Sequence, residues 1–467
     1  MRLMVQGGTV VTPSSTQRLD VLVEDETIVA LSVPDSELSR WFAAGCEQLV
    51  DASGRYVLAG GVDVHTHMEM PFGGTLASDS FETGTRAAIW GGTTTIVDFA
   101  IQPRGGSLHQ GLETWHRKAQ ARCAADFSFH MIISDVRDDS LREMDQLVEE
   151  GVTSFKLFMA YPGVFYSTDG QIMRAMQRAA GNGALIQMHA ENGPAIDELI
   201  KQALSGGETA PRFHGVTRPA RLEAEATHRA IELARLAGCR LYIVHLSSAD
   251  ALQEVVGARD RGQSVFAETC PQYLFLSDAD LARPDFEGAK FVCSPPLRAG
   301  RHQEALWQGL RTGDLSVVAT DHCPFCFKEQ KELGRGDFSK IPNGLPGVEH
   351  RMDLLFQGVL GGKLGLTRWA EVTSAGPARM FGLYPKKGSL TPGADADIVV
   401  YNPLAKRILS ASTHHMAVDY SCYEGMEVTG CVETVLLRGT VVLADGRYRG
   451  RPGDGQFIPR GLCQVGS

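Results

Sequence analysis

The chain has 467 residues, 43% of them hydrophobic and 21% charged, which is globular composition with enough length for one large core and a smaller domain. Its net charge of −10 disfavours nucleic acid and anionic membranes as partners. No apolar run reaches the ~18 residues of a membrane helix, the N-terminus lacks a signal-peptide core, and the scattered cysteines are typical of reduced thiols, so we expect a cytoplasmic protein.

Short alternating runs with turns occupy both ends of the chain. Residues 1–56 contain several, and residues 385–445 contain similar ones. Because alternation of apolar and polar side chains is typical of β-strands, both ends are predicted to be all-β and to pair as sequence-distant strands. We therefore predict a small β-sandwich domain from residues 1–56 and 385–467, the latter including a C-terminal tail. Residues 57–384 would form the catalytic domain.

Between the two ends, β-branched apolar runs alternate with amphipathic, helix-like segments such as 223–238. The runs are residues 57–67, 93–100, 125–134, 154–161, 184–191, 240–248, 264–274 and 316–324. This α/β alternation predicts a (β/α)8 barrel similar to the TIM barrel, although a doubly wound sheet would give a similar pattern. In such a barrel the chemistry collects at the C-terminal ends of the strands.

Unusual polar side chains fall towards the ends of these runs. They are His65, His67, Lys156, His189, His245 and Asp321. The first two lie one residue apart in a strand, so they point the same way. A single strand-end histidine is more often a hydrogen-bonded core residue, which is what we predict for His130. The joint placement instead predicts a metal centre.

The number of ligands indicates how many ions there are. Four imidazoles and a carboxylate are too many for one tetrahedral zinc, and slightly too few for two ions, which also need bridging anions. A hydroxide supplies one bridge. Lys156, its pKa lowered beside two cations, can react with carbon dioxide to give a carbamate that supplies the other. A Schiff-base lysine is the competing interpretation, and the Cys323/Cys326 pair is weak evidence for zinc.

Several sequence segments together resemble the cyclic amidohydrolases of the amidohydrolase superfamily, and within it the dihydropyrimidinase and D-hydantoinase group. The resemblance covers essentially the whole chain. It is carried by residues 60–74, 81–100, 154–165, 187–192, 242–248, 268–274, 293–298, 319–325 and 341–349. The stretch MEMPFGG at 68–74 has the hydantoinase-like form, whereas dihydroorotase-like members are expected to carry an arginine soon after the H-x-H pair.

The resemblance implies the barrel with a β-sandwich built from both chain ends, two zinc ions per subunit and a homotetramer. By this resemblance, His65, His67 and Asp321 hold the more buried ion. His189 and His245 hold the second, and the carbamylated lysine and a hydroxide bridge the pair.

The implied reaction is hydrolytic opening of a cyclic amide or imide, a 5-substituted hydantoin or a dihydropyrimidine, to an N-carbamoyl amino acid. Asp321 would carry the proton to the leaving nitrogen, and Tyr161 would donate to the oxyanion. Ser294 and Asn343 would hold the amide edge of the ring through backbone groups. Two loops would form a gate that favours apolar or aromatic substituents, with Met70, Phe72, Phe158, Tyr161 and Phe165 as its candidate residues.

Alternatives remain within and outside this class. Allantoin could be the substrate, Phe158 could simply pack the top of the barrel, and Tyr161 could be a rim aromatic. A non-catalytic, dihydropyrimidinase-like scaffold protein would have lost metal ligands, and this chain keeps the whole set.

Overall fold

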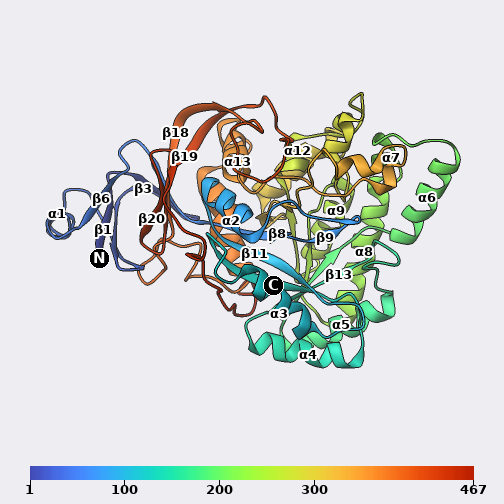
Figure 1. Ribbon diagram of the computed structural model, residues 1–467. Helices are drawn as coiled ribbons and strands as arrows, with labels where there is room; N and C mark the ends of the chain where they lie inside the picture. The colour runs from blue at the N-terminus through green and yellow to red at the C-terminus, as the bar shows by residue number, and fades with distance from the viewer. Residues whose placement is uncertain (467) are drawn as a thin grey trace.

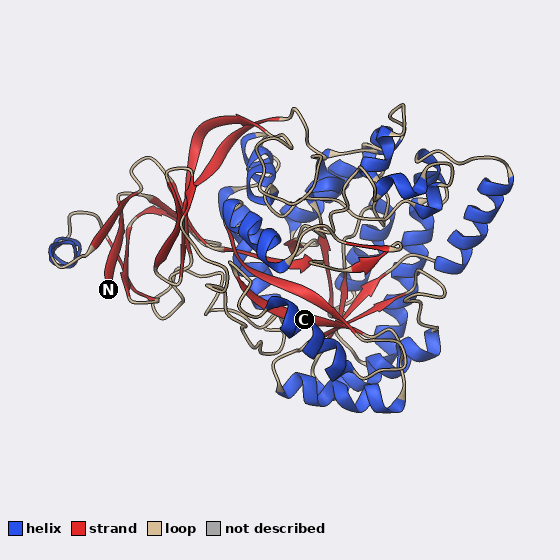
Figure 2. Ribbon diagram, in the orientation of Figure 1, coloured by secondary structure: helices blue, strands red, loops and turns tan. Residues whose placement is uncertain are grey.

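The computed structural model describes residues 1–466 and is built around an eight-stranded parallel sheet rolled into a barrel, with helices outside it (Figures 1 and 2). The strands pair in chain order, which confirms the predicted (β/α)8 barrel. They are β8 (Gly61–Thr66), β11 (Thr93–Ile101), β12 (Asp126–Ile132), β13 (Ser154–Phe158), β14 (Leu185–His189), β15 (Leu241–Ile243), β16 (Val265–Thr269) and β17 (Val317–Val318).

Helices surround the barrel, and several of them bury apolar side chains against its strands. The long helix expected near 223–238 is α8 (Ala220–Ala237), and it ends at Gly238, whose φ of 69° is the left-handed conformation that glycine adopts at low cost. The other main helices are α2 (Phe81–Trp90), α3 (Leu108–Ala119), α4 (Asp138–Glu149), α5 (Asp169–Asn182), α6 (Gly193–Ser205), α9 (Ala249–Asp260), α12 (Arg301–Thr312) and α13 (Arg351–Leu360). Among residues 1–466, none of the helices has both the length and the apolar character to cross a membrane.

Short elements fill the connections at the C-terminal ends of the barrel strands and beyond them. They are β9 (Pro71–Phe72), β10 (Thr75–Leu76), α7 (Arg212–Val216), α10 (Pro271–Phe275), α11 (Asp278–Leu281), η1 (Glu287–Phe291), η2 (Lys331–Gly334), η3 (Phe338–Lys340), α14 (Leu366–Ala370), η4 (Glu371–Ala375) and α15 (Gly376–Met380).

The barrel closes where β17 meets β8, and hydrogen bonds from side chains provide most of the contacts across this seam. Backbone pairing across this seam is an isolated bridge between Thr66 and His322. The Asp63 carboxylate accepts from the Thr320 N–H at 3.1 Å and from its hydroxyl at 2.6 Å. Arg351, fully buried at 0% exposed, donates to the carbonyls of Val62 at 2.9 Å and Val318 at 3.0 Å. One guanidinium therefore links the first barrel strand to the last.

Strands from both chain ends form two further sheets beside the barrel. A seven-stranded sheet mixes the two ends in the order β21-β20-β19-β18-β7-β2-β3, as predicted, and a four-stranded sheet in the order β5-β4-β1-β6 is wholly N-terminal. Their strands are β1 (Arg2–Gln6), β2 (Thr9–Val11), β3 (Thr16–Arg18), β4 (Asp20–Glu24), β5 (Thr27–Ser32), β6 (Gln48–Asp51), β7 (Tyr56–Ala59), β18 (Ile398–Ile408), β19 (Glu427–Leu437), β20 (Thr440–Ala444) and β21 (Arg447–Tyr448).

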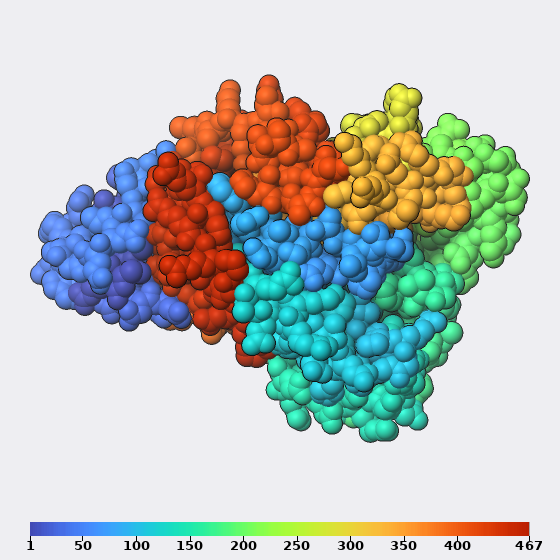
Figure 3. Space-filling model, viewed as in Figure 1, coloured from blue at the N-terminus to red at the C-terminus, as the bar shows by residue number. Residues whose placement is uncertain are grey.

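These sheets share one apolar core, to which Val5, Val57 and Ile398 contribute. In the space-filling view the N-terminal residues lie at one end of the molecule, beside C-terminal ones (Figure 3). The expectation of an all-β N-terminal segment was wrong at α1 (Glu37–Ala44), which Ser36 caps by accepting from the Ser39 N–H. The domain boundaries at 56/57 and 384/385 stay a prediction.

The C-terminal tail leaves the sheets and packs on the barrel. Phe457 pairs with Phe127 at the start of β12, and the Ile458 N–H donates to the Phe127 carbonyl at 2.8 Å. The buried guanidinium of Arg460 donates to the hydroxyls of Ser128 at 3.0 Å and Ser154 at 2.9 Å. Burial lowers the pKa of Arg460 to about 9. The tail thus places the guanidinium of Arg460 between the barrel strands.

Replacing Arg351 with methionine should destabilise the fold by about 3 kcal/mol, because the buried carbonyls of Val62 and Val318 and the Thr93 hydroxyl lose their donor. Chemical unfolding followed by circular dichroism measures the loss. Arg335→Met, at a half-exposed arginine paired with Glu332, is the control and should change little. Equal unfolding midpoints for the two variants would contradict a seam held by Arg351.

Candidate metal centre

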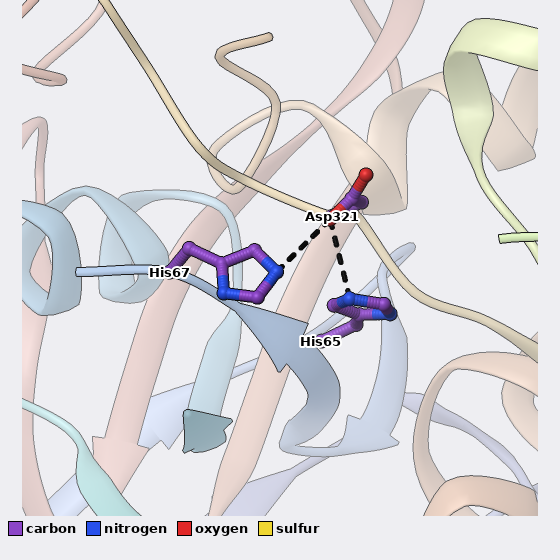
Figure 4. Close-up of side chains that lie close together, drawn as sticks. All are labelled: His65, His67 and Asp321. Atoms are coloured by element: carbon purple, nitrogen blue, oxygen red, sulfur yellow. Dashed lines mark ion pairs between the residues drawn. The ribbon is translucent and has the colours of Figure 1, made fainter. Parts of the chain in front are cut away.

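Two histidines and a carboxylate meet at the C-terminal mouth of the barrel, across its seam (Figure 4). His65 lies near the C-terminal end of β8, His67 comes just after that strand, and Asp321 lies just beyond β17. Oδ1 of Asp321 is 3.2 Å from Nε2 of His65 and 3.3 Å from Nε2 of His67. All three residues are buried, and their ligand atoms lie within 4.8 Å of one another, which is a spacing that one metal ion can bridge.

Glu268, at the end of β16, orients this cluster from behind. Its carboxylate binds Nδ1 of His65, accepts from the Tyr242 hydroxyl at 2.8 Å, and accepts from the His245 N–H at 3.0 Å. The bond to Nδ1 leaves Nε2 of His65 with its lone pair towards Asp321. Burial raises the pKa of Glu268 to about 8, and a cation bound at His65 would favour its ionised form. The sequence pattern did not single out Glu268, although it lies within the predicted strand at residues 264–274.

The other predicted ligands lie next to this cluster. Nζ of Lys156 is 2.9 Å from Nε2 of His65. The rings of His189 and His245 are 4.5 Å apart between centroids, and the His245 ring is 5.3 Å from that of His65. Nε2 of His189 is bound to the Glu191 carboxylate at 2.7 Å, so Nδ1 is the nitrogen that can accept a metal. The structure thus brings together all the residues predicted to bind metal.

The protonation states of these groups fit a metal site. Burial first, and then neighbouring positive or imidazole groups, hold the pKa of His65 and His245 well below the histidine range. Burial also lowers the pKa of Lys156 to about 8, against the opposing pull of Asp321. For Asp321, burial alone would raise the pKa, but His65 and His67 outweigh it and lower the value to about 2. Neutral imidazoles beside an ionised carboxylate are the donors that zinc binds.

An unpartnered nitrogen supports the same conclusion. Within residues 1–466, Nδ1 of His245, whose ring centroid lies 5.3 Å from that of His65, is buried and has no hydrogen-bond partner. A buried polar atom without a partner is costly unless a ligand or water satisfies it. The donor set therefore fits a cation beside these histidines.

Three of the predicted site residues adopt backbone conformations that are rare for side-chain-bearing residues. The φ values are 59° at Tyr161, 39° at His245 and 51° at Asp321. Such conformations are strained and persist only when the surroundings hold them, as the Glu268 carboxylate holds the His245 N–H. The sequence placed His245 and Asp321 at strand ends, but β15 ends at Ile243 and β17 at Val318. Both side chains are aimed by a turn that follows the strand.

A cavity opens above the metal centre. Its lining includes every predicted substrate-binding residue: Met70, Phe72, Phe158, Tyr161, Phe165, Ser294 and Asn343. Lys156, His67, His189, His245 and Asp321 form its polar floor. Gly344, which the sequence indicates as a loop glycine beside Asn343, also lines the cavity, and so does Cys323, for which the sequence predicts no role in substrate binding.

One part of the cavity wall is aromatic, and a neighbouring part, the polar wall, carries Ser294 and Asn343. Between ring centroids, Phe72 is 5.3 Å from Tyr161 and 6.5 Å from Phe165. Phe158 stacks on Phe165 with a centroid distance of 5.0 Å. Phe158 also stacks on the ring of His189 at 5.3 Å, so it packs the barrel top as well as lining the cavity. On the polar wall, the Asn343 side chain donates to the Ser294 hydroxyl at 3.1 Å.

Two further sequence predictions can be checked. His130 is a buried core residue that contacts the Ser154 hydroxyl at 2.6 Å and the Val64 carbonyl at 2.9 Å, as predicted. Cys323 and Cys326 are free thiols, like the other cysteines of the chain.

Comparison with known proteins places this site in a family. The model of the Amidohydrolase family matches residues 56–442. The chain is 65% identical over 463 residues to a D-hydantoinase from Streptomyces coelicolor, covering 99% of both chains, and 48% identical over 462 residues to a D-hydantoinase from Geobacillus stearothermophilus, covering 98% and 97%. It also matches the crystal structure of a dihydropyrimidinase from Brevibacillus agri with a TM-score of 0.96 and 48% identity, over 99% of each chain.

Replacing Glu268 with glutamine should weaken metal binding about tenfold or more, because an outer carboxylate that orients a metal-binding histidine is lost. Competition with a chelator, followed by elemental analysis, measures the affinity. Glu232→Gln, on the outer surface of α8, is the matched control. Unchanged metal affinity in Glu268→Gln would contradict the orienting role.

Proposed function

The chain belongs to the amidohydrolase family and is a cyclic amidohydrolase, and from this premise we propose that it opens 5-substituted hydantoins, and dihydropyrimidines with them, to N-carbamoyl amino acids. The observation that carries the proposal is a buried histidine–carboxylate metal centre on the floor of a cavity with an aromatic wall. Its relatives are a D-hydantoinase and a dihydropyrimidinase, which supports the same substrate class. The proposed compartment is the cytoplasm and the proposed assembly a homotetramer.

The proposed cofactor is a pair of zinc ions. His65, His67 and Asp321 would hold one ion, His189 and His245 the other, and Lys156 would bridge them as a carbamate. Support comes from the burial of Lys156 and its low pKa of about 8, because only a neutral amine reacts with carbon dioxide. When bound, the ions make hydroxide available at neutral pH and polarise the carbonyl that is attacked.

The residues around the ring would move the proton and stabilise developing charge. Asp321, ionised and at the cavity floor, would accept the proton of the attacking hydroxide and pass it to the leaving ring nitrogen. Burial, and then Glu191, raise the pKa of Tyr161 above its usual range, so its hydroxyl remains a donor to the carbonyl oxygen as charge develops there. Losing such a donor costs about 100-fold to 1,000-fold in rate.

The ring itself would be held between the two walls of the cavity. Backbone groups at Ser294 and Asn343 would bind its amide edge, and the aromatic wall would receive the substituent at the 5-position. Met70, Phe72, Phe158 and Phe165 belong to one apolar cluster, and such a surface favours apolar and aromatic substituents over charged ones. A non-catalytic scaffold role is disfavoured because the metal-binding residues are all kept.

The substrate class is tested by ring opening. We expect a 5-aryl or 5-alkyl hydantoin to be opened at least as well as dihydrouracil, and allantoin poorly, because allantoin carries a polar ureido group at the gate. Product formation with each ring gives kcat/KM. Phe165→Ala should shift the ratio between bulky and small rings by about tenfold, since a pocket change of this kind is worth ~1–3 kcal/mol. Efficient opening of allantoin without any activity on hydantoins would overturn the proposal.

The carbamate bridge is tested by Lys156→Ala. We expect the loaded protein to fall from about two zinc ions per chain to fewer than about one, with loss of activity, because the bridging anion is gone. Elemental analysis and turnover are measured together, and added short carboxylic acids should partly restore both. Lys363→Ala, at a surface lysine, is the control. Full metal content and activity in Lys156→Ala would refute the bridge.

A further inference from the structure

A buried lysine outside the metal centre ties together the two loops of the polar wall. Lys331 begins η2 and is 0% exposed. Its Nζ donates to the carbonyls of Val292 at 2.9 Å, Pro342 at 2.7 Å and Gly344 at 2.8 Å. An ammonium has three donors, so each is used, and each is used on backbone. Val292 belongs to the loop of Ser294, and the other two carbonyls flank Asn343.

These bonds fix how the peptide groups of Asn343 are turned. In a trans peptide the N–H points opposite to the C=O. The Pro342 carbonyl faces Lys331, so the N–H of Asn343 faces away from the ammonium. The Gly344 N–H donates to the Val292 carbonyl at 3.0 Å, so the carbonyl of Asn343 is turned away from the Val292 loop. Both backbone groups of Asn343 are therefore directed away from the bonds that join the loops, in a residue that lines the cavity.

The backbone of the Asn343 loop is also restricted by its close packing. Gly344 has a φ of 150°, and a Cβ there would lie 2.2 Å from the Cys323 carbonyl oxygen. The titratable groups around Lys331 are His214 and the thiols of Cys293, Cys323 and Cys422, and within residues 1–466 it forms no ion pair. A buried cation without a carboxylate is costly. A neutral side chain could fill the same space. The positive charge of Lys331 is therefore best explained by its three hydrogen bonds, which orient the carbonyls that accept them.

We propose that Lys331 is a positioning residue for substrate: its ammonium sets the spacing between the Ser294 and Asn343 loops and turns their backbone groups towards the amide edge of the ring. The proposal rests on the proposed function. Lys331 lines neither the cavity nor the metal centre, so it acts only through the loops. Its loss should weaken ring binding and leave the metal centre and its chemistry in place.

The test uses Lys331→Met, which keeps the length of the side chain and removes its donors, with Lys331→Arg as the conservative variant. Lys340→Met, at an exposed lysine of the same segment, is the matched control. For Lys331→Met we expect the wild-type zinc content and a KM for a 5-substituted hydantoin raised about tenfold, the equivalent of one lost hydrogen bond, with kcat changed less than about threefold. Lys331→Arg should restore part of the affinity, and Lys340→Met should behave as wild type.

A second measurement separates positioning from general damage. The same hydantoin methylated at N-1 keeps the bond that is cleaved but loses a donor at its amide edge. Wild type should open the methylated ring with a lower kcat/KM than the parent, and this discrimination should shrink in Lys331→Met, because the loop groups that read the edge are no longer held. A purely structural role for Lys331 would lower kcat/KM for both rings by the same factor and leave the discrimination unchanged.

The possible outcomes are distinguishable. If wild type opens no hydantoin, the proposed function fails. If wild type opens hydantoins and Lys331→Met keeps both its KM and its discrimination, the positioning role is wrong. Should Lys331→Met not fold, Lys331→Gln, which keeps an amide donor, is measured in the same way. A raised KM with reduced discrimination in Lys331→Gln supports the proposal. Failure of both neutral variants to fold would make Lys331 a structural residue and overturn the proposal.

Discussion

Across the seam of the barrel, Asp63 binds Thr320 and Arg351 joins the carbonyls of Val62 and Val318. The metal centre depends on these contacts because its ligands come from both sides of the seam. His65 lies in β8 and His67 comes just after it, whereas Asp321 comes after β17. Asp63 also accepts from the His65 N–H at 3.3 Å. The groups that close the barrel therefore also set the distance between the ligands, and an ion bound there would act as a further link across the same joint.

Residue pattern alone was enough to favour the barrel and to predict which histidines, lysine and carboxylate meet at its mouth, because these are local properties of the strands. The predicted substrate-binding residues, such as Tyr161 and Asn343, came instead from the family resemblance. The eight apolar runs and the alternation that puts His65 and His67 on one face are local properties of the chain. The predicted ligands Asp321 and His245 could be proposed from the sequence because they follow strands closely, although backbone with positive φ aims their side chains. Glu268, Arg351 and Lys331 were missed because their importance lies in partners far away in the sequence. The helix α1 was missed because eight residues between short strands carry little periodic signal.

Three buried cations of this chain share an unusual choice of partner. Arg460 among the barrel strands, Arg351 at the seam and Lys331 below the polar wall all donate to backbone carbonyls, and Arg460 also donates to serine hydroxyls. Strand ends and irregular loops leave carbonyls without the partners that a helix or a sheet would supply, and a buried carbonyl without a donor is costly. One cation satisfies several carbonyls at once and fixes their directions. The same physical device therefore serves the interior, the closure and the mouth of the barrel.

The C-terminal tail has a consequence for how the protein is made. Ser128 and Ser154 leave the ribosome hundreds of residues before Arg460, which binds them. Domains fold as units while the N-terminal part of the chain emerges first, but here the interior of the barrel lacks one of its groups until Arg460 has been made. A nascent chain therefore holds an unfinished barrel even after all eight of its strands have emerged. A product truncated before Arg460 would contain every barrel strand, yet it would leave the Ser128 and Ser154 hydroxyls and the Phe129 carbonyl without their donor.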